Sequence, residues 1–181
     1  MKKGLFAFWI VCCLHSAAQP LRWRLSPDGG ITWKVTGGAP HTDHIEMSGR
    51  RISAIITYGV DSLRQLVWRR QLVFPMLRTI PNNTHASLSP VFDDNTIDSV
   101  TVDGQLLKET PLEFSTHGYL RSLSSTNTAI QVERCIYPSM DKAVCVERYL
   151  LTNTGMKPLL LNVPEKDVQR VTDAAKGVYG A

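Results

Sequence analysis

The densest group of side chains able to hold a ligand lies at residues 41–46, HTDHIE. Successive side chains of a strand alternate between its two faces, so His44 and Glu46 are expected on one face. Asp43 and Ile45 are expected on the other face. Two neighbouring ligands hold a metal ion only with a third from elsewhere in the chain. A polar strand at a surface or a domain interface therefore explains this run better than a metal site.

A second group of polar side chains lies in the loop 81–90, where Asn82, Asn83 and His85 stand close together in sequence. Amide and imidazole groups supply both donors and acceptors, which sugar hydroxyls require. The same side chains also commonly hydrogen-bond the backbone of their own loop. Together with His44 and Glu46, these three residues are the predicted contacts to a glycan or to a neighbouring domain.

Catalytic signatures are missing from the sequence. Asp93 and Asp94 are paired carboxylates, but glycoside cleavage needs two carboxyl groups about 5–10 Å apart across a substrate, which neighbours in one turn do not provide. The chain contains no GxSxG, no phosphate-binding loop and no GxGxxG. The sequence therefore predicts no catalytic residue, no metal ligand and no cofactor in this chain.

Two cysteines, Cys135 and Cys145, lie on either side of a turn expected near Met140. Centred there, the turn would place them opposite each other on consecutive strands. An oxidising compartment would permit a disulfide, which would stabilise the fold by about 2–3 kcal/mol through a short closed loop. Two buried thiols that pack as small apolar groups are the equal alternative.

The first 18 residues are predicted to be a cleavable signal peptide. Lys2 and Lys3 precede an apolar run at residues 5–14, which is shorter than the roughly 20 residues of a membrane span, and small residues follow at 16–18. The protein is therefore expected to be exported. The family resemblance described below implies a bacterial protein, located in the periplasm, at the cell surface or outside the cell.

Charge and hydropathy exclude two classes of partner. The chain has 20 Lys and Arg against 16 Asp and Glu, and two of the basic residues lie in the expected signal peptide. No block of five basic residues occurs, so nucleic acid is not an expected partner. No long apolar run follows the signal peptide, so no membrane span is expected in the mature chain.

Alternating apolar and polar residues predict strands along most of the chain. In the hairpin 21–35, Trp23 and Trp33 are equidistant from Asp28 and are expected to be cross-strand partners. Core packing explains this pair better than an exposed platform for sugars. Asp103 and Gly104 form the preferred pair for a two-residue hairpin turn.

The remaining strands are short and regularly spaced, and no segment predicts a helix. They are expected at residues 51–60, 63–74, 76–80, 97–102, 105–109, 111–114, 119–123, 128–137, 142–152 and 158–163. About eleven short strands at this spacing predict an all-β, antiparallel β-sandwich over residues 19–163. Residues 164–181 are weakly patterned and are expected to begin a linker or a following segment, so the chain is expected to be truncated.

Four passages carry a resemblance to a known family. They are HTDHIEMSGRRISAIITYGVD, LVWRRQLVFPMLRTIPNNTHASL, VTVDGQLL and IYPSMDKAVCVERYLLTNTG. They resemble the N-terminal region, a domain of unknown function, of large secreted bacterial proteins of the six-hairpin, (α/α)6-barrel glycosidase type. The resemblance covers residues 23–181, and its passages are not catalytic motifs.

The resemblance implies a β-sandwich that precedes a helical barrel carrying the catalytic carboxylates. The barrel would lie beyond residue 181, so no catalytic residue is carried over and the chain alone is expected to be inactive. The implied partners are carbohydrate, a C-terminal catalytic domain, or both. A freestanding carbohydrate-binding module is an alternative, in which Trp23, Trp33 or Trp68 would present a platform. A structural envelope protein is another.

Overall fold

A computed structural model describes residues 21–37, 39–74 and 88–169. Its regular structure in these residues consists of 13 strands and one short 3-10 helix. All strand pairs are antiparallel, and they form three sheets. The predicted all-β class is therefore confirmed. The expected signal peptide at 1–18 lies outside the described residues.

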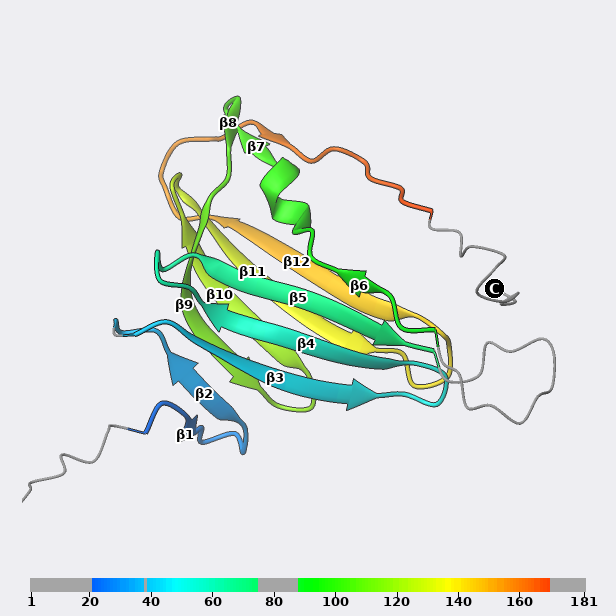
Figure 1. The fold of residues 1–181 in the computed structure, drawn as a ribbon. Coiled ribbons are helices and arrows are strands. Elements are labelled where there is room, and N and C mark those ends of the chain that lie inside the picture. Colours follow the sequence, from blue (N-terminus) through cyan, green and yellow to red (C-terminus); the bar gives the residue numbers. More distant parts are fainter. Residues whose placement is uncertain (1–20, 38, 75–87, 170–181) are drawn as a thin grey trace, which may run out of the picture.

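Two larger sheets form the layers of the sandwich (Figure 1). The six-stranded sheet has the order β1 (Arg24–Leu25), β2 (Ile31–Lys34), β9 (Glu109–Thr116), β10 (Leu120–Thr126), β11 (Ile130–Pro138) and β12 (Cys145–Asn153). The four-stranded sheet has the order β3 (His41–Ser48), β4 (Ser53–Val60), β5 (Leu66–Val73) and β6 (Val91–Phe92). The first hairpin, β1–β2, joins its sheet by pairing β2 with the much later β9.

The inner faces of these sheets meet in one apolar core. Strict alternation in β4 buries every second side chain, because alternate residues of a strand point to the same face. The buried members of the core are Trp33, Ala54, Ile56, Tyr58, Val60, Trp68, Phe114, Leu120 and Ile136. Since they come from both sheets, the β-sandwich arrangement follows directly.

The third, small sheet covers one end of the sandwich. It has the order β13 (Leu161–Asn162), β7 (Thr101–Val102) and β8 (Gln105–Leu106), and a 3-10 helix, η1 (Thr96–Ser99), precedes it. Asp103 and Gly104 have positive φ angles of 49° and 81° between β7 and β8, as a two-residue hairpin turn of this kind requires. The predicted Asp-Gly hairpin is therefore confirmed.

The strand predicted over 97–102 is wrong in its first half. Residues Thr96–Ser99 form η1 instead, and the strand is confined to Thr101–Val102. Asn95 begins the turn because its side chain accepts a hydrogen bond from the backbone N–H of Ile97. The apolar side chains of Ile97 and Val100 are buried in a second core cluster. Their spacing of three positions fits one face of a 3-10 turn and not one face of a strand.

The two tryptophans of the first hairpin contact each other, as predicted. Their ring centroids lie 6.0 Å apart at an edge-to-face angle of 64°. Trp33 is buried, and Trp23 is half-buried and packs against the core. The prediction of core packing is therefore confirmed for this pair.

The predicted facing of Cys135 and Cys145 is wrong. Cys135 stands opposite Arg148, and Cys145 stands opposite Pro138. The turn is centred later than Met140, since the Ser139 backbone N–H donates to the Val144 carbonyl oxygen at 2.8 Å. A separation of three positions puts the two thiols on opposite faces of the hairpin. Both cysteines are free.

A thiol-reactivity measurement tests this arrangement. Burial, followed by the nearby Glu147 carboxylate, raises the pKa of the Cys145 thiol to about 11. In a chain that starts at Gln19 and carries Cys135→Ser, we expect iodoacetamide at pH 8 to modify Cys145 on the order of 100-fold more slowly in the folded than in the denatured state, because only the thiolate reacts. If the chain with both cysteines showed no reactive thiol in guanidinium, a disulfide would be established and the free-thiol assignment would fall.

Candidate functional site

A concave surface lies on the outer face of the six-stranded sheet. We call it the polar groove; it encloses about 520 Å³. Neighbouring strands align Thr32, Ser115 and Arg121 in one cross-strand row along its floor. The side chains that line it are mainly polar: Ser26, Asp28, Thr32, Glu113, Ser115, Thr116, His117, Tyr119 and Arg121. Such a lining supplies hydroxyl, carboxylate, imidazole and guanidinium groups within one hollow.

Arg121 organises the floor of the polar groove. Its Nη1 donates to Glu113 Oε1 at 3.2 Å, and its Nη2 donates to Glu133 Oε2 at 2.8 Å. The hydrogen bond from Arg121 is the main cause that lowers the pKa of Glu133, while burial acts weakly against it. The same partners raise the pKa of Arg121. The Glu133 carboxylate is therefore stabilised as an anion that accepts hydrogen bonds.

Two turns form the rim of the polar groove. His117 Nδ1 of the β9–β10 turn lies 3.5 Å from Asp28 Oδ2 of the β1–β2 turn. The backbone N–H of Gly30 is the largest cause that lowers the pKa of Asp28, followed by His117. The ring of Tyr119 stands next to them with 42% of its surface exposed. The rim thus offers an aromatic face beside charged hydrogen-bonding groups.

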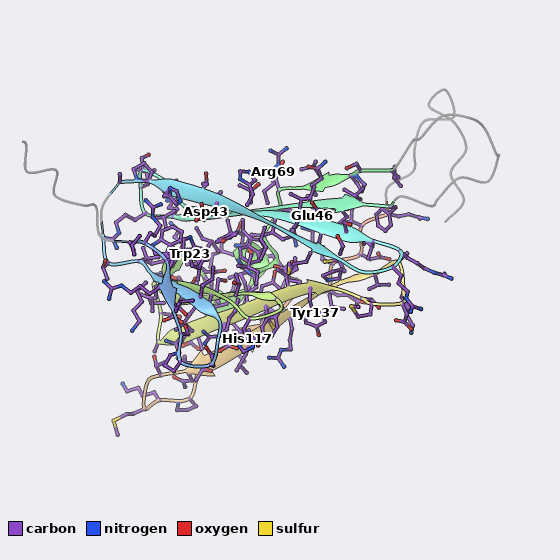
Figure 2. All side chains as sticks on the ribbon, turned by 90° about the horizontal axis from the view of Figure 1, so that it is seen from below. Trp23, Asp43, Glu46, Arg69, His117 and Tyr137 are labelled. Atoms are coloured by element: carbon purple, nitrogen blue, oxygen red, sulfur yellow. The ribbon has the colours of Figure 1, made fainter. Side chains whose placement is uncertain are left out.

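A second concavity, the apolar groove, adjoins the first. It encloses about 380 Å³ and shares Thr116 and Tyr119 with the polar groove. Its lining comes from β3, from the β9–β10 turn and from the end of β11: Ile45, Glu46, Met47, Ser48, Thr116, Gly118, Tyr119, Tyr137, Pro138 and Met140. Seen from below, Glu46 lies on the upper layer and Tyr137 and His117 on the lower layer (Figure 2). The apolar groove therefore opens between the two sheets.

An exposed aromatic pair separates the two grooves. The rings of Tyr119 and Tyr137 have centroids 6.3 Å apart at 65°. Both side chains remain well exposed, at 42% and 38%. Exposed aromatic rings with polar tips are typical of binding surfaces, because one part of the ring packs against apolar groups while the hydroxyl bonds polar ones.

Of the five predicted contact residues, the structure describes two, His44 and Glu46. His44 and Glu46 both project from the exposed side of β3, as the alternation predicted. Only Glu46 reaches a groove, where it lies on the rim of the apolar groove. Asn82, Asn83 and His85 lie outside the described residues.

The polar groove was not predicted. Its rim comes from Asp28 and His117, which the sequence placed in turns, and its floor comes from Glu113 and Arg121, which it placed in strands. The two turns meet only because β2 pairs with β9, with Ile31 opposite Thr116. The sequence feature that could have indicated the groove was the pair of glycine-containing turns at 28–30 and 117–118. Whether these turns meet in space depends on the strand order.

The tryptophans proposed as a sugar platform are instead part of the core. Trp33 and Trp68 are 7% and 5% exposed. Trp23 donates its indole N–H to Asp43 Oδ2 at 2.8 Å, and His41 Nε2 contacts Asp43 Oδ1 at 2.9 Å. The hydrogen bond from Trp23 to Asp43 ties the first hairpin to β3. Trp33 and Trp68 are therefore too buried to stack on a sugar, and Trp23 is packed against the core.

A buried ionic cluster, which the sequence did not reveal either, lies between β11, β12 and β5. We call it the Arg134 cluster. Arg134 has no exposed surface; its Nη2 donates to Glu109 Oε1 and Asn95 Oδ1, each at 2.7 Å. Its Nε lies 3.3 Å from Glu147 Oε1, and Arg70 Nη1 donates to Glu147 Oε2 at 2.6 Å.

Aromatic rings complete the Arg134 cluster. The guanidinium carbon of Arg134 lies 4.7 Å from the ring centre of Trp68 and 5.0 Å from that of Tyr149. Burial raises the pKa of the Tyr149 hydroxyl to about 12. The cluster is enclosed by side chains, so we assign it a structural role. At its outer end Asp94 contacts Arg70 and Lys166, and the hydrogen bond from Lys166 is the main cause that lowers the Asp94 pKa.

Two searches of the described residues bear on metal and membrane binding. Within 21–37, 39–74 and 88–169, no three His, Cys, Asp or Glu side chains are grouped so that they could hold a metal ion. Over the same residues, no helix has the length and hydropathy needed to cross a membrane.

Comparison with known proteins adds no assignment. No protein-family model, no curated protein and no solved structure matches this chain.

Proposed function

We propose that this chain is the non-catalytic β-sandwich of an exported glycoside hydrolase, and that its polar groove contacts the glycan. The observation that carries the proposal is the composition of that groove. An exposed aromatic ring, Tyr119, stands beside hydroxyl, carboxylate and guanidinium groups on one sheet face. The glycosidase assignment itself comes from the family resemblance of residues 23–181.

The chemistry of the groove suits a carbohydrate. A sugar ring has an apolar face of C–H groups, which packs on an aromatic ring, and hydroxyls that both donate and accept. Tyr119 would take the apolar face. The hydroxyls of Thr32 and Ser115 and the carboxylate of Glu113 would bond the sugar hydroxyls. Thr32, Glu113 and Ser115 lie on the strands β2 and β9, whose paired backbones hold these side chains in place.

The same groups are poorly suited to cleave a glycoside. An acid that protonates a leaving group needs a raised pKa. Arg121 instead lowers the pKa of Glu133 and ion-pairs with Glu113. Binding without cleavage is therefore the function that this groove supports, and cleavage would belong to a helical barrel elsewhere in the parent protein.

We expect Tyr119→Ala to weaken glycan binding roughly tenfold, because the variant removes the stacking ring. Isothermal titration against a panel of soluble plant polysaccharides would measure the change. Val144→Ala is the matched control, since Val144 is also an exposed apolar residue but lines neither groove. The proposed glycan contact is wrong if no polysaccharide binds the unsubstituted chain. It is also wrong if Tyr119→Ala and Val144→Ala bind the polysaccharide with the same affinity.

The association with a hydrolase needs a separate test. Sequencing the reading frame downstream of the codon for Ala181 should reveal repeated amphipathic helical hairpins. A stop codon there, combined with glycan binding, would show a freestanding carbohydrate-binding module and remove the hydrolase part of the proposal. A stop codon without glycan binding would leave a structural envelope protein.

A further inference from the structure

Among the described residues, two long strands, β3 and β12 (Cys145–Asn153), stand at the edge of a sheet, and of these two β3 borders the apolar groove. β3 (His41–Ser48) is the terminal strand of the four-stranded sheet and pairs only with β4. Among the described residues, no other backbone group bonds to it. An exposed edge of this length is a template for another strand, and proteins commonly block such edges with Lys, Pro or a bulge. β3 contains neither Lys nor Pro, and its register with β4 is unbroken. Asp43, the charged residue on its inner face, is held within the chain by Trp23 and His41.

The unpaired edge of β3 also borders the apolar groove. Ile45 and Met47 line that groove from β3, and Tyr137 and Met140 line it from the opposite sheet. Met140 is 71% exposed. A strand added to β3 would cover these side chains and satisfy the backbone groups of the edge together. The groove and the edge therefore act as one surface for an extended segment.

The charge pattern of β3 fits a second copy of the same strand. His44 and Glu46 lie two positions apart on its exposed face, with Ile45 between them on the inner face. In an antiparallel pair centred on Ile45, His44 of each copy stands opposite Glu46 of the other. An imidazole can donate an N–H to a carboxylate that faces it across strands, and such complementary pairs stabilise a sheet. Centring the pair on His44 would instead place Thr42 opposite Glu46, and His44 would face its own copy.

We infer that this chain forms a two-fold symmetric dimer through β3, centred on Ile45. The two four-stranded sheets join into one continuous sheet, and the interface is isologous because both copies contribute the same surface. The two Ile45 side chains meet on the inner face, next to the apolar grooves. Both His44–Glu46 pairs lie on the outer face. The apolar groove adjoins the polar groove and shares Tyr119 with it, but β3 itself contributes no residue to the polar groove. Oligomeric state and glycan binding are therefore measured separately.

Charge exchange on β3 tests this dimer. In His44→Glu, two carboxylates face each other across the interface, and in Glu46→Lys an imidazole faces an ammonium. We expect each variant alone to dimerise about tenfold more weakly than the unsubstituted protein. An equimolar mixture of the two variants should form a heterodimer. In it, the carboxylate introduced at position 44 of one chain faces the ammonium introduced at position 46 of the other. The native Glu46 of the first chain faces the native His44 of the second. Sedimentation equilibrium of the purified exported protein would give the dissociation constants.

Two controls keep the test decisive. The double variant H44E/E46H retains complementary pairs and should dimerise like the unsubstituted protein. Thr152→Glu adds the same charge on an exposed position of β12 and should change nothing. Near-ultraviolet circular dichroism would show that every variant is folded. The inference is overturned if the unsubstituted protein is monomeric at about 100 μM, which would leave β3 to a foreign peptide. It is equally overturned if the single variants dimerise unchanged, which would place the interface elsewhere.

Discussion

Arg134→Met is expected to lower the free energy of unfolding by about 3–5 kcal/mol, because removing one partner of a buried ion pair leaves the others uncompensated. Glu109 would lose the guanidinium that hydrogen-bonds it, and Glu147 would lose one of its ion-pair partners; the side chain of Glu109 is only 3% exposed. The contacts of the Arg134 guanidinium with the rings of Trp68 and Tyr149 would be lost as well. Urea unfolding followed by tryptophan fluorescence measures the change.

The chain supplies a matched control in Arg121→Met. Arg121 also bridges two carboxylates, Glu113 and Glu133, but its side chain is partly exposed on the outer face of the sheet. Ion pairs at a surface contribute about 1 kcal/mol or less. Adding Glu109→Gln and Glu147→Gln to Arg134→Met should recover part of the stability, because the buried negative charges disappear. Equal losses for Arg134→Met and Arg121→Met would contradict the assigned role of the Arg134 cluster.

Gly59→Ala is expected to destabilise the fold by roughly 2–5 kcal/mol, from backbone strain and from steric overlap. Gly59 has a φ of 151°, which residues with a side chain rarely adopt. A Cβ atom at this position would lie 2.1 Å from the carbonyl oxygen of His41 and 2.8 Å from Cα of Thr42. Both are backbone atoms of β3, so the strand itself would have to move. Thermal unfolding by calorimetry would show the loss.

Gly104→Ala separates the two causes. Gly104 also has a positive φ, 81°, but a Cβ atom there would meet nothing within 4 Å. Only the strain of the left-handed conformation remains, which costs about 1–2 kcal/mol. Gly59→Ala should therefore be clearly the more destabilising of the two. A smaller effect for Gly59→Ala than for Gly104→Ala would show that β3 adjusts easily.

Local patterns in the sequence were sufficient to predict the fold class and several of its details. The strands predicted over 51–60 and 63–74 correspond to β4 and β5, and Trp23 and Trp33 meet as their spacing around Asp28 predicted. The Asp103-Gly104 turn followed from the φ angles that these residues tolerate. Each of these predictions depends on residues that are neighbours in the chain or on one hairpin.

Features that depend on strand order could not be predicted in the same way. The polar groove needs the turns that carry Asp28 and His117 side by side, and no local pattern specifies that β2 pairs with β9. Arg134 and Arg70 interrupt apolar alternation on β11 and β5, which was a visible signal. Their carboxylate partner Glu147 lies on β12, so the interruption could not be interpreted without the register.

The pairing of β2 with β9 has a consequence for the order in which the protein folds. Trp33 pairs with Phe114 only after all of β3–β8 has been synthesised, whereas β3, β4 and β5 are consecutive hairpins. Contacts between distant segments form late because closing a long loop costs entropy. We therefore expect the four-stranded sheet to form early and the first hairpin to dock last. Until then its two tryptophans are exposed to water, and aggregation is the main hazard during this interval.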